Sequence, residues 1–272
     1  MLLTIENILF TTALIIYVVT MLLYFLFAVT KKEFFSKIAL ITEIAALLMH
    51  LAAIVIRGIA AKRLPLTNQY EFASAFAFGL CLVTLIFSLR FKFRALGAFA
   101  LPLVILIIGY AAMQSREVHE LMPALKSSWL GIHVSTAIIA YGSFGLAFVL
   151  SIVYLVRDRM KEEGFLAKHT PPKEKLDLIA YRSICLGMLF LTFTMITGAI
   201  WAEQAWGSYW SWDPKETWSL VTWVIYAIYL HFRLIRKKRG KFCAIFAIAG
   251  FLAVIFTYVG VNTFLPGVHS YK

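Results

Sequence analysis

Eight long apolar stretches make up most of this chain of 272 residues, and they restrict its fold more than any other feature. A backbone in hydrocarbon must satisfy its own N–H and C=O groups, so about 20 consecutive apolar residues predict a helix that spans a membrane. The stretches lie at about 8–29, 38–60, 69–89, 95–113, 129–156, 178–200, 217–235 and 242–262. We therefore expect an all-α polytopic membrane protein with about eight transmembrane helices, which form a single membrane domain over residues 1–272.

The composition supports this class and excludes others. Hydrophobic residues are 61% of the chain and charged residues 15%, whereas soluble globular domains have about 45–50% and about 25%. A cytosolic enzyme, a secreted scaffold and a disordered chain are therefore excluded. We expect the first stretch to remain in the protein, because residues 1–7 contain no basic residue and no small-residue cleavage site follows.

The positive charges predict the orientation in the membrane. Lys and Arg number 26 against 14 Asp and Glu, which gives a net charge of +12. Most of them fall in four alternate connections, 31–37, 90–94, 157–175 and 233–241. By the positive-inside rule both termini and the segment 201–217 face the outer, periplasmic or lumenal side. The basic excess thus indicates topology and contact with anionic lipids of the bilayer, and not nucleic acid. The expected location is the cell inner (cytoplasmic) membrane, or a thylakoid membrane in a plastid.

Tryptophan is concentrated in one outward segment. Six of the seven Trp residues lie between positions 201 and 223. An aromatic belt at the membrane interface explains one or two Trp per helix end, but this density favours a platform for a flat, apolar ligand. Asp213 before Pro214, with Glu216 three residues after Asp213, predicts a helix start with an N-cap, a proline at the first helical position and a capping box. The candidate platform residues are Trp201, Trp206, Trp210, Trp212, Asp213, Pro214 and Trp218.

Four of the six histidines are candidate ligands. His133, at the outer start of the fifth stretch, and His269, in the outward tail, share a compartment with the tryptophan segment. His50, near the middle of the second stretch, and His231, in the inner half of the seventh, fall within the bilayer, where ionisable residues mark functional sites.

Glu43, His50 and Arg57 are spaced by seven residues and share one helix face. An internal hydrogen-bond network between helices is the alternative interpretation of this stripe, and for His50 of its role.

Two histidine pairs on separate helices fit bis-imidazole ligation of haem iron. Zinc is less favoured because no cluster of three or four ligands is visible. No Ser or Cys stands in a nucleophile context with His and an acid, so no catalytic residue is assigned beyond the haem ligands. The three cysteines, Cys81, Cys185 and Cys243, lie far apart in apolar stretches and are interpreted as small buried hydrophobic residues.

The stretch from Trp201 to Trp218 closely resembles the tryptophan-rich "WWD" signature of the haem-handling cytochrome c assembly family, which includes CcsA/ResC and CcmC. Further pieces resemble the CcsA branch, and together they cover about residues 40–272. These pieces are His50 to Arg57, Pro65 to Glu71, Trp129 to His133, Tyr229 to His231, Gly260 to Asn262, and His269 to Tyr271.

The resemblance implies a site and an activity. Two outward histidines, here His133 and His269, would ligate haem b at the WWD segment, and membrane histidines, here His231 and His50, would hold haem on its way out. With a CcsB/ResB-type membrane partner, the protein would attach haem by thioether bonds to the CxxCH cysteines of apocytochrome c, as the haem-handling subunit of a cytochrome c synthase.

His231 is expected to lie deeper toward the inner face than His50, and in the family the partner can supply the opposite membrane histidine. Two alternatives remain open. One is a CcsA-like haem-binding regulator of tetrapyrrole synthesis, and the other is a haem transporter without ligation activity.

Overall fold

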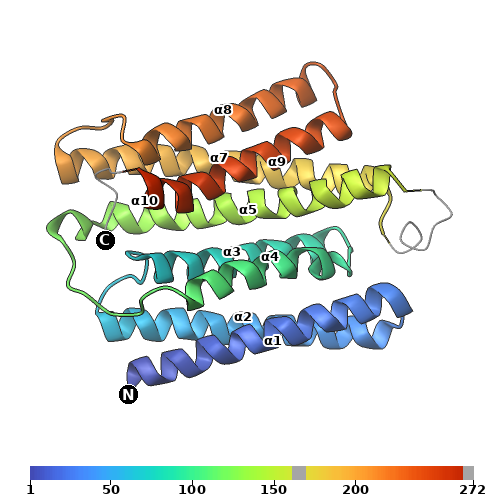
Figure 1. Ribbon diagram of the computed structural model, residues 1–272, viewed down its shortest axis with the longest axis horizontal. Helices are drawn as coiled ribbons and strands as arrows, with labels where there is room; N and C mark the ends of the chain where they lie inside the picture. The colour runs from blue at the N-terminus through green and yellow to red at the C-terminus, as the bar shows by residue number, and fades with distance from the viewer. Residues whose placement is uncertain (161–169, 266–272) are drawn as a thin grey trace. The chain divides into compact units, whose positions relative to one another are not determined.

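The computed structural model describes residues 1–160 and 170–265, and each of the eight predicted stretches is helical in it (Figure 1). The elements are α1 (Leu2–Thr30), α2 (Glu33–Ala61), α3 (Gln69–Arg90), α4 (Leu96–Ala112), a 3₁₀ turn (Pro123–Leu125), α5 (Ser128–Asp158), α7 (Lys173–Trp206), α8 (Pro214–Leu234), α9 (Lys241–Ile255), a π-helical turn (Phe256–Gly260) and α10 (Val261–Phe264). No strand occurs in the described ranges. The all-α class is therefore confirmed.

Not all of these helices qualify equally as membrane spans. Six are long and apolar enough to cross a membrane: α1, α2, α3, α5, α7 and the continuous run from α9 through α10. Helix α4 is apolar but has 17 residues. Helix α8 follows the tryptophan segment and is not among the six. The count of eight spans and the outer position of the termini stay predictions.

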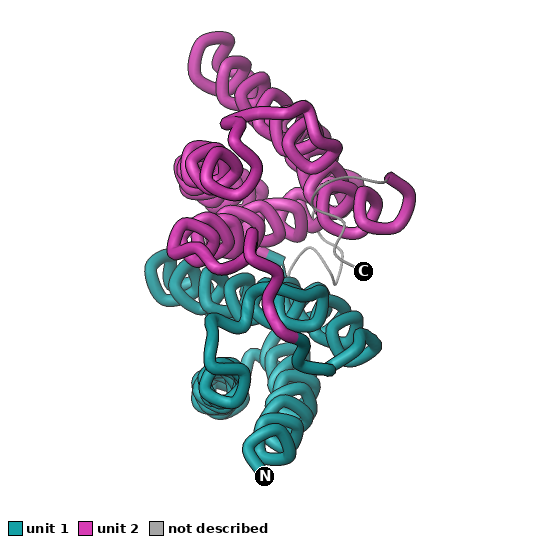
Figure 2. The backbone as a smooth tube through the Cα atoms, turned by 90° about the vertical axis from the view of Figure 1, so that its left-hand side faces the viewer, with its two compact units in different colours: residues 1–119, 165–170 teal, residues 120–164, 171–272 magenta. Residues whose placement is uncertain are grey.

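The chain divides into two compact units (Figure 2). The first comprises residues 1–119 with 165–170, and the second comprises residues 120–164 with 171–272. Helices α1 to α4 belong to the first unit, and α5 to α10 belong to the second.

In the first unit, α1 and α2 pack along a seam of buried residues spaced three and four apart. On α2 the seam includes Glu43, His50 and Arg57, which confirms that these three residues share one buried face. A repeat near 3.5 residues keeps the same face of each helix on its partner. Glu43 accepts a hydrogen bond from the Tyr24 hydroxyl at 2.5 Å, so the polar stripe is paired within the bundle.

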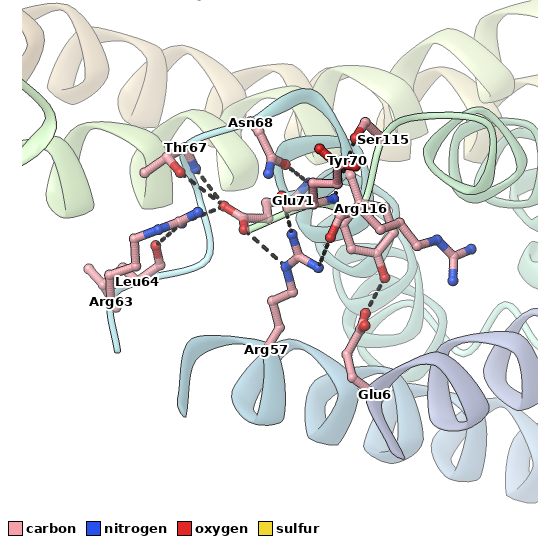
Figure 3. A network of polar contacts seen from close by, with 11 residues as sticks. Glu6, Arg57, Arg63, Leu64, Thr67, Asn68, Tyr70, Glu71, Ser115 and Arg116 are labelled. Carbon is pink, nitrogen blue, oxygen red and sulfur yellow. Dashed lines mark hydrogen bonds and ion pairs between the residues drawn. The ribbon is translucent and has the colours of Figure 1, made fainter. Parts of the chain in front are cut away.

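An ion-pair network ties together one end of the first unit (Figure 3). The Arg57 guanidinium donates to Glu71 at 3.0 Å and to the backbone carbonyls of Arg116 at 2.8 Å and Glu117 at 3.3 Å. Glu71 also accepts from Arg63 at 2.7 Å. Because Arg57 is 2% exposed, these partners offset the cost of burying its charge.

In the second unit, α5 and α7 pack closely through small residues. Gly187 lies against the Phe144 ring, and a β-carbon at position 187 would come within 2.5 Å of that ring. Ser183 donates to the backbone carbonyl of Ser143 at 2.7 Å. Small residues let two helix backbones approach, which is how helices associate in lipid.

Candidate functional site

The tryptophan segment is shorter as a connection than its sequence suggests, because α7 continues through Trp206. Trp201 and Trp206 therefore lie on the last turns of α7, and Gly207 ends the helix with a φ of 75°. Glycine adopts this left-handed conformation without the penalty of a side chain. Trp210 and Trp212 lie in the turn, and Trp218 lies on α8.

The start of α8 has the predicted capping box. Asp213 is the N-cap and accepts from the Lys215 N–H at 2.9 Å, and Pro214 occupies the first helical position. The Glu216 carboxylate accepts from the Asp213 N–H at 3.2 Å. The predicted helix start, with its N-cap, first-position proline and capping box, is therefore confirmed.

Glu216 also holds the turn that precedes the cap. The same oxygen, Oε2, accepts from the Ser211 N–H at 2.8 Å and from the Ser211 hydroxyl at 3.3 Å. It thereby binds the backbone on both sides of Trp212, whose φ is 58° and whose side chain is 68% exposed. A bulky residue in the left-handed region costs roughly 1–2 kcal/mol, so the carboxylate holds a strained backbone that presents an indole ring to the surroundings.

His133 lies on α5 against α7. Its Nδ1 is 2.8 Å from the backbone carbonyl oxygen of Thr194. Because a carbonyl oxygen only accepts, Nδ1 carries the hydrogen, and in the neutral ring the lone pair is then on Nε2. The imidazole stacks on Trp201, with centroids 5.8 Å apart and planes at 29°.

Trp201 joins His133 to the rest of the aromatic cluster. It is buried, donates from Nε1 to the backbone carbonyl of Ala124 at 2.9 Å, and contacts Trp206 edge-on at 4.8 Å. An open groove of about 490 Å³ lies beside this contact, within the range of small-molecule sites. Its lining residues are Pro123, Ala124, Lys126, Ser127, Ser128, Trp129, Gln204 and Ala205.

The remaining tryptophans form two further contacts. Trp210 and Trp212 meet edge-on at 5.7 Å. Trp218 packs on Phe256 at 4.3 Å, where the last long helix changes to π geometry over Phe256–Gly260. A π-helical turn in an α-helix often marks a functional region, and this one precedes the tail that carries His269.

Lys215 is the cation nearest the cap. Burial lowers its pKa to about 8, while Asp213 acts in the opposite direction. The ammonium group is thus charged at neutral pH and loses its charge as the pH rises through about 8.

The other candidate ligands lie in different surroundings. His231 is exposed on α8, and its ring contacts Phe232 but forms no hydrogen bond with any residue of 1–160 or 170–265. It is 13 residues from Trp218, which is about 20 Å along a helix. His269 lies outside the described residues.

His50 belongs to the first unit and is completely buried there. Its Nδ1 lies 3.3 Å from the Tyr17 hydroxyl, and its Nε2 lies 2.9 Å from the Ser74 hydroxyl. Both ring nitrogens therefore have a partner within the bundle.

Some contacts at the site have no signal in the sequence. The acceptor for His133 is a backbone carbonyl, and any residue type at 194 would provide one. Gly198 on α7 leaves the space that the His133 ring occupies. A glycine inside an apolar helix is a sequence feature from which such a close approach can be inferred, but Gly198 is not among the site residues predicted above.

Comparison with known proteins gives a consistent result. Residues 66–269 match the family described as cytochrome C assembly protein. The cytochrome c biogenesis protein CcsA of Pyropia yezoensis is 37% identical in an alignment of length 249 that covers 76% of this chain and 78% of that protein. CcsA of Chlamydomonas reinhardtii is 41% identical in an alignment of length 214 that covers 76% of this chain and 60% of that protein. CcsA of Prochlorococcus marinus (strain MIT 9301) is 34% identical in an alignment of length 270 that covers 90% of this chain and 87% of that protein.

A solved structure shares the fold. The cytochrome c heme lyase CcmF superposes with a TM-score of 0.70 at 15% identity and matches 95% of this chain. This chain spans about half of that one, 47% of its length. The likeness extends to α1 and α2, which precede the matched family region.

Proposed function

The chain belongs to the cytochrome c assembly protein family and is of the CcsA type, and on this premise we propose that it binds haem b at the outer face of its membrane. With a CcsB/ResB-type partner it attaches that haem to the CxxCH cysteines of apocytochrome c. The membrane is the cell inner membrane, or the thylakoid membrane in a plastid.

The observation that carries this proposal is the setting of His133. Its Nδ1–H bond to the Thr194 carbonyl leaves the lone pair on Nε2, which is the atom and tautomer that an iron ligand needs. The ring is backed by Trp201 and lies at the end of α7 that leads into the tryptophan segment. A porphyrin is flat and apolar with an iron that takes axial imidazoles, so the side chains at this site fit haem as a substrate.

We assign distinct roles to the members of the site. His133 and His269 are the axial ligands at the outer face. Trp206, Trp210, Trp212 and Trp218 supply aromatic surface for the macrocycle, and the Asp213–Pro214 cap fixes the turn between them. Lys215 provides a positive charge for a haem propionate.

For the membrane position we propose His231, which is exposed on α8 and so is accessible to a ligand or partner. Its opposite ligand comes from the partner protein. His50, in the first unit, is the other membrane candidate. Ligation by His50 requires that its hydrogen bonds to Tyr17 and Ser74 be broken.

To form the thioether bonds, the protein needs to position the haem against the cysteine thiols more than it needs to transfer protons. Each thioether forms when a cysteine S–H adds across a haem vinyl group, so no leaving group or external oxidant is involved. Holding the vinyl carbons against the two thiols makes the reaction effectively intramolecular, which lowers the activation barrier by several kcal/mol. The haem carries the reactivity, and this chain supplies binding and orientation.

Co-expression with a CcsB-type partner and a CxxCH reporter tests the proposal. We expect covalent haem on the reporter with the wild-type chain and its loss with His133→Ala plus His269→Ala. Covalent haem that survives both substitutions would contradict the assigned ligands. A chain that binds haem but never modifies the reporter would instead favour the regulator or transporter alternatives.

A further inference from the structure

We propose that α7 positions His133 for iron through two backbone features, the Thr194 carbonyl as acceptor and the absence of a side chain at Gly198. This inference rests on the proposed function, because it concerns the ligand that we assign to haem. It names positioning residues for that ligand.

The first feature is a carbonyl turned toward α5. Three threonines on this part of α7, Thr192, Thr194 and Thr197, donate their hydroxyls back to carbonyls four residues earlier. Hydroxyl bonds of this kind often bend a helix. The Thr194 carbonyl oxygen accepts both from His133 Nδ1 at 2.8 Å and from the Thr197 hydroxyl at 3.3 Å.

The second feature is the close approach of the ring to the helix backbone. A β-carbon at Gly198 would lie 2.7 Å from Nδ1 and 2.8 Å from Cε1 of His133. Contacts that short do not occur, so any other residue at 198 would push the ring away from the Thr194 carbonyl.

Trp201, one turn further along α7, covers the ring on a face by stacking. About two turns of α7, from Thr194 to Trp201, therefore set the ring's position, its tautomer and its plane.

These contacts have a chemical consequence for a bound iron. An Nδ1–H bond to a carbonyl raises the basicity of Nε2 and fixes the ring's orientation. Loss of such a partner typically lowers metal affinity 10–100-fold. A more basic imidazole stabilises ferric over ferrous iron. Loss of the Nδ1–H bond to the Thr194 carbonyl therefore also shifts the midpoint potential of the haem iron to more positive values.

Gly198→Ala is the direct test, and the chain offers two matched controls. Gly187→Ala is on the same helix and also presses on α5, but against Phe144 and not against a histidine. Gly109→Ala places a methyl group in a helix where nothing lies within 4 Å.

We expect Gly198→Ala alone to lower haem affinity 10–100-fold and to shift the potential upward. If Gly198→Ala and Gly109→Ala had the same haem affinity and midpoint potential, the proposal would be overturned. It would also be overturned if Gly187→Ala shifted both quantities as much as Gly198→Ala.

A second experiment does not depend on folding of the alanine variant. In His133→Gly the lost ring is replaced by a free imidazole, and binding of haem is followed by its absorption spectrum. We expect 4-methylimidazole, which keeps an N–H for the Thr194 carbonyl, to restore the six-coordinate spectrum at least tenfold more effectively than 1-methylimidazole, which has none. Equal rescue by both would overturn the role of the carbonyl.

Different results would contradict the proposed function and the positioning role of α7. If the wild-type chain binds no haem, or if His133→Ala binds it with an unchanged spectrum, the proposed function is wrong. If His133→Ala loses the spectrum while the glycine variants and the two imidazoles behave alike, the function stands and the positioning role is wrong.

Discussion

Replacing Glu216 should release the turn that presents Trp212. The carboxylate oxygen accepts from the N–H groups of Ser211 and Asp213, at 2.8 and 3.2 Å, on either side of the tryptophan. Hydrogen bonds to a charged group contribute about 1.5–3 kcal/mol each, and partial exposure of Glu216 places these at the lower end. Together they exceed the roughly 1–2 kcal/mol cost of the left-handed backbone at Trp212.

In Glu216→Ala we therefore expect the Trp212 backbone to leave the left-handed region. Two bonds of about 1.5 kcal/mol less the cost of this backbone conformation leave a surplus of about 1–2 kcal/mol, which corresponds to roughly 5–30-fold in an equilibrium constant. The measurement is the rate of haem transfer from the purified protein to apomyoglobin, which should rise by about 5–30-fold. Glu216→Gln keeps an acceptor oxygen without the charge, so its effect should be below about fivefold.

The matched control is Glu203→Gln, near the end of α7, where the side chain forms no hydrogen bond with any other described residue. It removes the same negative charge from the same part of the second unit. If Glu216→Ala and Glu203→Gln transferred haem at the same rate, Glu216 would not hold the turn that presents Trp212.

Three other predictions follow from separate contacts. Arg57→Met should lower the free energy of unfolding by about 2 kcal/mol, because Glu71 loses one charged hydrogen-bond donor but keeps Arg63. Labelling of the buried cysteine Cys81 during thermal unfolding in detergent reports the loss, and an unchanged transition would argue against the network. Haem retention should fall as the pH rises through about 8 or above, because the Lys215 ammonium is charged below its pKa and a bound propionate moves that pKa upward. Lys215→Arg should abolish this pH dependence. If the pH dependence persists in Lys215→Arg, another group causes it. Trp201→Phe keeps an aromatic ring but removes the donor to a backbone carbonyl, so stability should fall by about 1–2 kcal/mol; the same thermal assay measures it, and an unchanged transition would show that the bond adds nothing.

The helices and the α8 cap were predictable because their causes are local. Long apolar runs must form helices in lipid, and all eight predicted stretches are helical. Asp213, Pro214 and Glu216 act within one turn of each other, so their spacing was sufficient to predict the cap. The shared face of Glu43 and His50 followed from helix periodicity alone.

Helix α7 continues through Trp206 and ends at Gly207, a residue type that commonly ends helices, so the connection predicted from residue 201 begins too early although the signal is local. The other parts that the sequence did not reveal depend on contacts between distant segments. The partners of His50, Tyr17 and Ser74, come from two other helices. The acceptor for His133 is a backbone atom 61 residues away and carries no side-chain signature.

His50 and His231 belong to different units and have different environments. Both are ionisable residues within predicted spans, which is why the sequence predicts both as membrane ligands. Each has a different environment, since His50 is enclosed by aromatic rings in the first unit and His231 is exposed in the second. Burial and hydrogen bonding are properties of the folded chain, and residue type alone does not report them.

The absorption spectrum of the purified membrane protein, with pyridine extraction of its pigment, tests the central claim most directly. We expect a coloured protein with a low-spin, six-coordinate spectrum, a b-type haem in the extract, and loss of that spectrum in His133→Ala. A protein that takes up no haem, or one whose spectrum is the same with and without the His133 imidazole, would contradict it.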